Sequence, residues 1–190
     1  MSFGNADAWV AHFENPHRDT WQKPDEVVTA LGLEHAMHIA DIGAATGYFA
    51  VRLARAVPQG RVWAIDIEPD MVRYINRRAR KLGIDNLLGL LGTPSDPLLP
   101  APVDLVLLVD TYHHISDRVA YFTRLREQLR TPGRIAVVDF VPGESPVGPP
   151  PEMRLAPEVV QQELVEAGFV LQQSLDLLPY QYVLIFGVVP

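Results

Sequence analysis

The segment His38-Ile-Ala-Asp-Ile-Gly-Ala-Ala-Thr-Gly-Tyr-Phe-Ala-Val-Arg-Leu-Ala54 takes an apolar strand into a loop of small residues and then into a helix. Gly43, Ala45 and Gly47 leave space for a ligand to approach the backbone at the N-terminus of that helix. A dinucleotide-binding loop follows the spacing G-x-G-x-x-G, whereas this loop reads G-x-A-x-G and places Tyr48 at the last position of that template. The spacing therefore disfavours a nicotinamide-dependent oxidoreductase.

Two carboxylates flank this loop and indicate the charge of its ligand. Asp41 comes just before the loop, where it would repel a pyrophosphate and attract an ammonium or sulfonium group. Asp66 ends the next apolar run, nineteen residues after Gly47, where a carboxylate accepts hydrogen bonds from the hydroxyls of an adenosine ribose. The alternative for Asp66 is a helix-capping carboxylate before Pro69. The first reading predicts a nucleoside that carries positive charge.

Around this segment, short apolar runs alternate with amphipathic stretches of helical length, which predicts an α/β fold with a largely parallel sheet. The two runs after Gly168 are joined by a few residues, so they must pair antiparallel. The expected strands are Met37–Ile42, Arg61–Ile67, Leu87–Leu91, Val103–Val109, Arg134–Phe140, Phe169–Leu177 and Tyr180–Val189. The expected helices are Asp25–Leu31, Gly47–Val57, Pro69–Leu82, Asp117–Leu129 and Pro157–Ala167.

The 190 residues suit a single domain. Residues 1–23 have weak periodicity and are expected to form an irregular lid or packing arm, residues 24–140 the ligand-binding core, and residues 156–190 the last helix and strands. Residues 141–155 are rich in proline and glycine and are expected to form an active-site loop.

Four motifs resemble those of the class I S-adenosylmethionine-dependent methyltransferases, in particular the small-molecule branch with a methyltransferase-11-like domain. They are Asp41-Ile-Gly-Ala-Ala-Thr-Gly47, Ala64-Ile-Asp-Ile-Glu-Pro-Asp-Met71, Val103-Asp-Leu-Val-Leu-Leu-Val-Asp110 and Thr131-Pro-Gly-Arg-Ile-Ala-Val-Val-Asp-Phe140. The resemblance implies a Rossmann-like seven-stranded, mostly parallel sheet with a C-terminal antiparallel hairpin and helices on both faces. It also implies S-adenosylmethionine as cofactor and a small-molecule methyl acceptor with an oxygen, nitrogen or sulfur nucleophile.

The resemblance assigns cofactor-binding roles by position. Asp41, Gly43, Ala45 and Gly47 would surround the methionyl portion, Asp66 the ribose, Ile67 and Met71 the adenine, Gly92 and Thr93 the adenine edge, and Asp110 the amino-acid end. The family usually has glycine at the position of Ala45, and the acidic residue usual in the adenine-edge loop is displaced to Asp96. A protein that binds the cofactor without turning it over is the alternative to an enzyme.

The acceptor is expected at the carboxyl ends of the strands, bordered by Tyr112 and Asp139, with Arg18 or Gln22 meeting it from the N-terminal segment while Trp21 covers the cofactor. His114 is the candidate general base because histidine titrates near neutral pH. If the segment stays extended, Asp110, Tyr112 and His114 share one side, and His113, the second candidate, takes the other. The alternative is a structural histidine.

Three classes of partner are disfavoured by composition and spacing. His113, His114, Asp110 and Asp139 match no known metal-ligand spacing, so no metal is expected. A net charge of −7 argues against nucleic acid, and Arg73, Arg77, Arg78, Arg80 and Lys81 fit a solvated helical face. The absence of cysteine and of any signal-peptide or membrane-spanning pattern leads us to expect a cytoplasmic protein, and the oligomeric state stays open.

Overall fold

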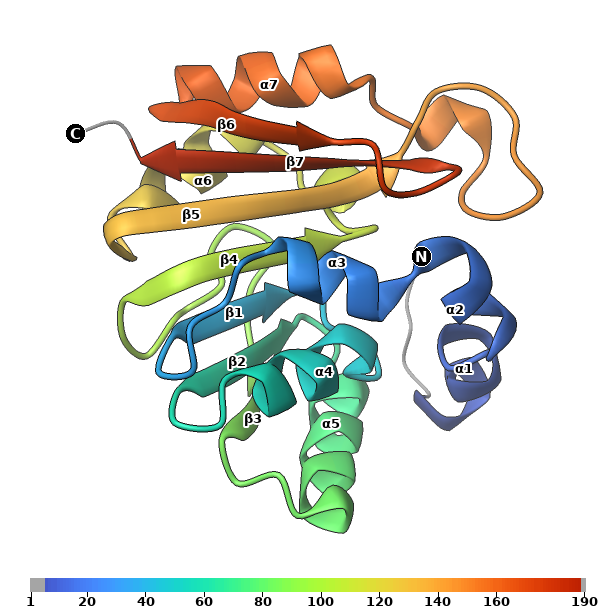
Figure 1. The fold of residues 1–190 in the computed structure, drawn as a ribbon, viewed down its shortest axis with the longest axis vertical. Helices are drawn as coiled ribbons and strands as arrows, with labels where there is room; N and C mark the ends of the chain where they lie inside the picture. The colour runs from blue at the N-terminus through green and yellow to red at the C-terminus, as the bar shows by residue number, and fades with distance from the viewer. Residues whose placement is uncertain (1–5, 189–190) are drawn as a thin grey trace.

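A seven-stranded sheet forms the centre of the computed structural model, which describes residues 6–188 (Figure 1). The strand order is β3-β2-β1-β4-β5-β7-β6, and β7 runs antiparallel to both of its neighbours while the other pairs are parallel. The strands are β1 His38–Ile42, β2 Arg61–Asp66, β3 Leu87–Leu91, β4 Val103–Val109, β5 Leu129–Phe140, β6 Phe169–Leu175 and β7 Gln181–Val188. The predicted fold class and the C-terminal antiparallel hairpin are thus confirmed.

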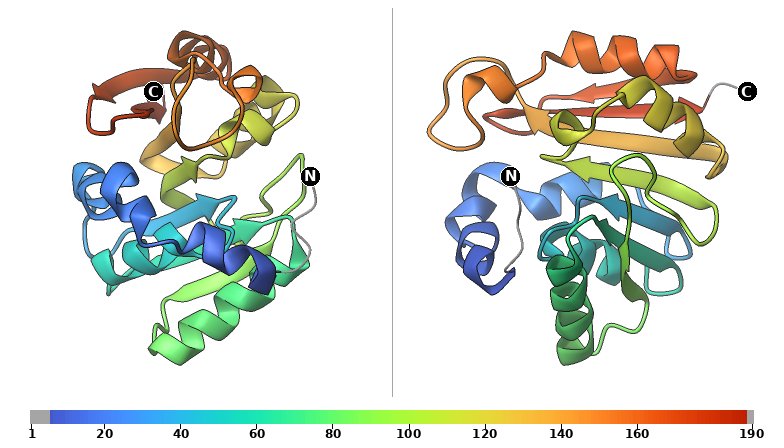
Figure 2. Two further views of the ribbon diagram at one scale, coloured as in Figure 1. Left: turned by 90° about the vertical axis from the view of Figure 1, so that its right-hand side faces the viewer. Right: turned by 180° about the vertical axis from the view of Figure 1, so that it is seen from behind.

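Helices cover both faces of the sheet (Figures 1 and 2). α3 (Pro24–Ala30), α4 (Tyr48–Ala56) and α5 (Pro69–Leu82) pack on one face, and α6 (Arg118–Arg126) and α7 (Pro157–Glu166) pack on the other. Two short 3₁₀ helices, η1 (Tyr112–His114) and η2 (Pro151–Met153), follow β4 and β5 respectively.

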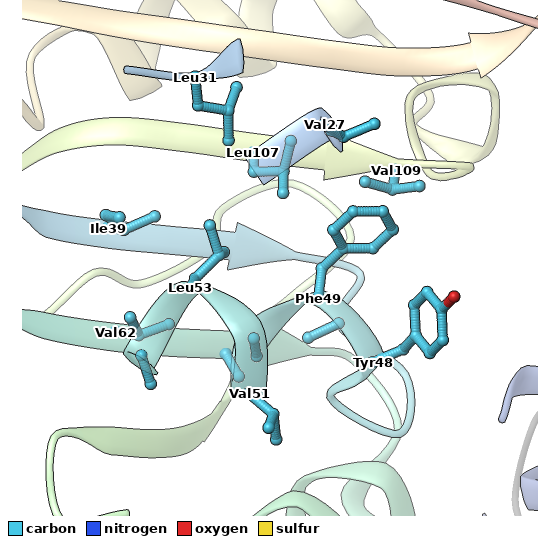
Figure 3. Close-up of a cluster of buried hydrophobic side chains, with 14 of the residues drawn as sticks. Val27, Leu31, Ile39, Tyr48, Phe49, Val51, Leu53, Val62, Leu107 and Val109 are labelled. Atoms are coloured by element: carbon cyan, nitrogen blue, oxygen red, sulfur yellow. The ribbon is translucent and has the colours of Figure 1, made fainter. Parts of the chain in front are cut away.

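The alternation of side chains along the strands divides the core into two clusters. In β4, Leu105 and Leu107 point into the cluster beneath α4, whereas Val106 and Leu108 point into the cluster beneath α6 and α7. Figure 3 shows the first cluster, in which Phe49 and Leu53 of α4 lie over Leu107 and Ile39. Burial on both faces explains why these strands are nearly continuous runs of Val, Ile and Leu.

Three expectations about the elements were wrong. The N-terminal segment is helical rather than irregular, with α1 at Ala6–Phe13 and α2 at His17–Gln22. β5 begins at Leu129 instead of Arg134, because Leu129 pairs with Val103 ahead of an irregularity in the register. The helix expected at Asp117–Leu129 is α6 at Arg118–Arg126, since Leu129 belongs to β5.

Candidate functional site

The loop after β1 is held to β2 by its backbone. The Gly43 and Ala44 N–H groups both donate to the Ile65 carbonyl, at 2.8 and 3.0 Å. Gly43 has a φ of +75°, and a Cβ at this position would lie 2.2 Å from Thr111 Oγ1. The space at Gly43 is therefore filled by Thr111 of the chain itself, whereas Gly47, with a φ of +80°, precedes α4 and has no atom closer than 3.4 Å to an added Cβ.

Asp66 braces the same loop from the end of β2. Its Oδ2 accepts a hydrogen bond from the Ala45 N–H at 2.8 Å, and its Oδ1 accepts one from the Glu68 N–H at 2.9 Å. Glu68, not Asp66, is the N-cap residue of α5, so the capping alternative does not describe it. Burial raises the pKa of Asp66, and the backbone hydrogen bonds oppose that rise. The carboxylate lies beside the glycine loop, as the ribose role requires.

Asp41 is buried beneath the loop and lacks a partner for one oxygen. No hydrogen-bond donor among the described residues reaches Asp41 Oδ2. Burial, and secondarily the charge of Asp66, raise the pKa of Asp41 to about 7. An unsatisfied buried carboxylate is costly, and a cationic ligand group would relieve that cost.

A cavity of about 110 Å³ opens beside Asp66 and includes Ile67, Thr93 and His114 in its lining. Its other lining residues are Ile42, Gly43, Ile65, Pro94, Pro97, Thr111, Ile115 and Tyr121. Ile67 is 54% exposed, as an adenine-flanking side chain can be, but Met71 is fully buried and does not line the cavity. Gly92 is covered by Ile65 and Pro97, and Asp96 accepts the Leu98 N–H, so neither lines it.

Asp110, after β4, is the centre of a polar network with the N-terminal helices. Its Oδ2 accepts from Gln22 Nε2 at 3.1 Å, its Oδ1 accepts from Gln181 Nε2 at 2.5 Å, and Arg18 Nη2 lies 3.9 Å away. Burial raises the pKa of Asp110 to about 6, against the opposing charge of Arg18. Arg18 and Gln22, which were expected to contact the acceptor, therefore pack against Asp110 at the end of β4.

The segment after Asp110 is not extended, and this changes which side chains share a side. The 3₁₀ helix η1 buries Tyr112, whose ring stacks on Phe122 and whose hydroxyl donates to Glu163 at 2.8 Å. Tyr112 therefore packs in the core and does not border an acceptor.

The two histidines have different surroundings. His113 Nδ1 lies 2.9 Å from Asp139 Oδ2, and the two side chains are 2% and 0% exposed. Asp139 thus supports His113 rather than facing an acceptor. His114 is more exposed than His113 and lines the cavity, and its pKa is lowered by partial burial of its ring and by the neighbouring His113.

Phe140, at the end of β5, joins the arm to the proline-rich loop. The Trp21 ring lies 5.6 Å from the Phe140 ring, and the Arg154 guanidinium lies 5.1 Å from it. Arg154 also donates to the carbonyls of Gly143, Val147 and Pro149. Both segments therefore meet at the carboxyl ends of the strands, the edge seen in the left view of Figure 2.

Sequence reasoning missed four residues of this region. Gln181 reaches Asp110 because β7 lies beside β5 in the sheet, and Thr111 reaches the loop because it packs against Gly43. Neither contact can be read from the spacing of residues along the chain. Glu14 contacts Arg78, which lies 64 positions away along the chain, and Arg154 donates to backbone carbonyls of its own loop. The only sequence signal for Arg154 is a single arginine near a proline- and glycine-rich stretch.

Two further expectations concern partners. None of the helices between residues 6 and 188 is long and apolar enough to cross a bilayer. Among the same residues, no three His, Asp or Glu side chains are grouped in a way that could hold a metal ion.

Methyltransferases are among the sequence relatives of this chain. The chain is 29% identical over 159 residues to 27-O-demethylrifamycin SV methyltransferase of Amycolatopsis mediterranei (strain S699), covering 83% of this chain and 56% of that protein. This chain spans about half or less of the length of the curated relatives it matches.

Two solved structures of methyltransferases share the fold. A SAM-dependent methyltransferase from Aquifex aeolicus superposes with a TM-score of 0.89 at 25% identity, covering 96% of this chain and 98% of that one. An O-methyltransferase (NcsB1) from neocarzinostatin biosynthesis, solved with S-adenosyl-L-homocysteine and 1,4-dihydroxy-2-naphthoic acid, shares the fold with a TM-score of 0.74 at 17% identity. That match covers 91% of this chain and 55% of the other.

The methyltransferase domain family matches residues 33–175, which include the glycine loop, Asp41, Asp66 and β6, the first strand of the C-terminal hairpin. The chain therefore belongs to the methyltransferase domain family and has the class I fold of the S-adenosylmethionine-dependent methyltransferases.

Proposed function

We propose that this protein binds S-adenosylmethionine and transfers its methyl group to a small-molecule acceptor. The observation that carries the proposal is the unpartnered Asp41 carboxylate beneath a glycine loop braced by Asp66. When bound, the cofactor would supply an activated methyl group on a sulfonium, ready for in-line displacement by an oxygen, nitrogen or sulfur nucleophile. The names of the similar proteins favour oxygen.

The chain's own residues have distinct roles in this proposal. Asp41 and Asp110 would attract the ammonium group of the cofactor's amino-acid end, and Asp66 would accept hydrogen bonds from the ribose hydroxyls. Ile67 and Thr93 would flank the adenine in the cavity beside Asp66. The arm and the loop of residues 141–155 would exclude water and shape the acceptor site.

Two measurements separate this function from its alternatives. Calorimetry with S-adenosylhomocysteine and NAD should show binding of the first compound only, and NAD binding alone would favour an oxidoreductase. An assay for release of S-adenosylhomocysteine against a panel of hydroxylated, amine and thiol metabolites should then find an acceptor. Cofactor binding without turnover on any acceptor would favour a non-catalytic binding protein.

His114 should act as a general base when the acceptor is a hydroxyl group. Because burial and His113 lower its pKa, His114 is neutral and able to take a proton at pH 7. We expect His114→Ala to lower kcat by about 100-fold for a hydroxyl acceptor, and to remove the acidic limb of the pH–rate profile. His35→Ala serves as the matched control, and an unchanged profile in His114→Ala would leave His114 a structural residue.

Cofactor binding should release protons below neutral pH. Asp41 and Asp110, with pKa values of about 7 and about 6, must ionise to pair with a cation, so affinity should fall as the pH drops from 8 to 5.5. In the ligand-free protein the same raised pKa values lower stability as the pH rises from about 4 to about 7. Calorimetry at pH 6.5 in buffers of different ionisation enthalpy measures the released protons, and Asp41→Asn should reduce their number.

A further inference from the structure

The N-terminal arm contacts the glycine loop through one carboxylate, that of Glu14 at the end of α1. Glu14 Oε1 accepts a hydrogen bond from Thr46 Oγ1 at 2.5 Å, and Glu14 Oε2 accepts one from Arg78 Nη2 at 2.7 Å. Arg78 Nη1 also bonds to Glu14 Oε1 and donates to the Thr46 carbonyl at 3.0 Å. Glu14, Thr46 and Arg78, which come from the arm, the loop and α5, thus form a closed set of polar contacts that we name the Glu14 clamp.

The Glu14 clamp is partly shielded from water. Thr46 is fully buried, and the side chains of Glu14 and Arg78 are each only 21% exposed. Arg78 was expected on a solvated helical face with its basic neighbours, but it points to the loop. Charge-assisted hydrogen bonds in such surroundings are stronger than those on an open surface.

The Glu14 clamp lies at the border of a groove. A groove of about 610 Å³ is lined by residues of the arm, α3, α4 and α5, among them Glu14 and Arg78. A second attachment lies farther along, where Tyr48 bonds to Asp19 and Arg18 lies 4.1 Å from the Tyr48 ring. Removing Glu14 therefore leaves the arm another anchor.

The residue next to Thr46 holds an unfavourable backbone conformation. Ala45 has a φ of +48°, in the left-handed region that an L-residue with a Cβ adopts at a cost. Its N–H is fixed by Asp66 on one side, and Thr46 is fixed by the clamp on the other. Such conformations persist where the surroundings over-determine them.

We propose that Glu14 is a positioning residue for the cofactor: through Thr46 and Arg78 it holds Ala45 in the left-handed conformation that aims the loop at the ligand. The inference rests on the proposed function, because the ligand of the loop is S-adenosylmethionine. It gives the arm a task in cofactor binding that is separate from covering the acceptor.

The test compares Glu14→Ala in two backgrounds by calorimetry with S-adenosylhomocysteine. In the natural background, the loss of charge-assisted hydrogen bonds should weaken binding by about tenfold or more. In an Ala45→Gly background, the loss should shrink to about twofold, because glycine adopts a positive φ without the clamp. A merely structural role for Glu14 would give the same loss in both backgrounds.

Glu26→Ala is the matched control, because Glu26 is a glutamate of α3 whose ion pair is with Lys23 instead of with Arg78. It should bind S-adenosylhomocysteine as the unaltered protein does. Equal losses in both backgrounds, or no loss in Glu14→Ala, would overturn the inference. Failure of the unaltered protein to bind S-adenosylhomocysteine would instead overturn the proposed function.

Discussion

Replacing Asp66 with asparagine is expected to weaken binding of S-adenosylhomocysteine by about 10²- to 10⁴-fold, since two charge-assisted hydrogen bonds to the ribose are each worth about 1.5–3 kcal/mol. The substitution also affects the loop. Asp66 accepts the Ala45 and Glu68 N–H groups with its two oxygens, whereas asparagine has a single acceptor oxygen. Calorimetry measures the loss directly.

Asp70→Asn is the control for this prediction, because Asp70 lies four residues away and pairs with Arg73 on the surface. It should leave the affinity unchanged. Thermal unfolding of both variants separates a loss of binding from a loss of folding. Affinity within threefold of the unaltered protein in Asp66→Asn would show that this carboxylate does not meet the ribose.

Replacing Gly43 with alanine should lower the free energy of unfolding by about 2–5 kcal/mol. A Cβ would lie 2.2 Å from Thr111 Oγ1, and overpacking costs about 1–3 kcal/mol. The φ of +75° adds about 1–2 kcal/mol for a residue with a Cβ. This sum is a large part of the stability of a typical domain. Urea unfolding measures it.

Gly32→Ala isolates the backbone contribution. Gly32 has a φ of +57° with no atom within 4 Å of an added Cβ, so only the conformational cost of about 1–2 kcal/mol applies. The double variant Gly43→Ala, Thr111→Ala should recover part of the remainder, because it removes the two nearest atoms. A loss in Gly43→Ala no greater than that in Gly32→Ala would refute the steric argument.

The sheet could be predicted because its signal is local. Strands buried on both faces require nearly continuous apolar runs, and Leu105–Val109 carries that pattern within five residues. Asp41 and Asp66 could also be predicted, because each stands at a fixed distance from the loop along the chain. Their surroundings, an unpartnered oxygen for one and two backbone donors for the other, come from folding.

The directions of the side chains after β4 could not be predicted. An extended chain was assumed there, and in an extended chain successive side chains point to opposite sides. A 3₁₀ helix places side chains about a third of a turn apart, so Tyr112 enters the core, His113 meets Asp139, and His114 faces the cavity. The N-terminal helices were missed for a different reason. They are short, and contacts such as Gln22 to Asp110 come from a residue 88 positions away.

The contacts of Trp21 and Arg154 with the Phe140 ring have a consequence for changing the acceptor under the proposed function. Transplanting residues 141–155 from a relative would remove the Arg154 guanidinium from the Phe140 ring, while the Trp21 indole would stay in contact with it. A functional chimaera should therefore exchange both segments together, and natural relatives that differ in one should differ in the other.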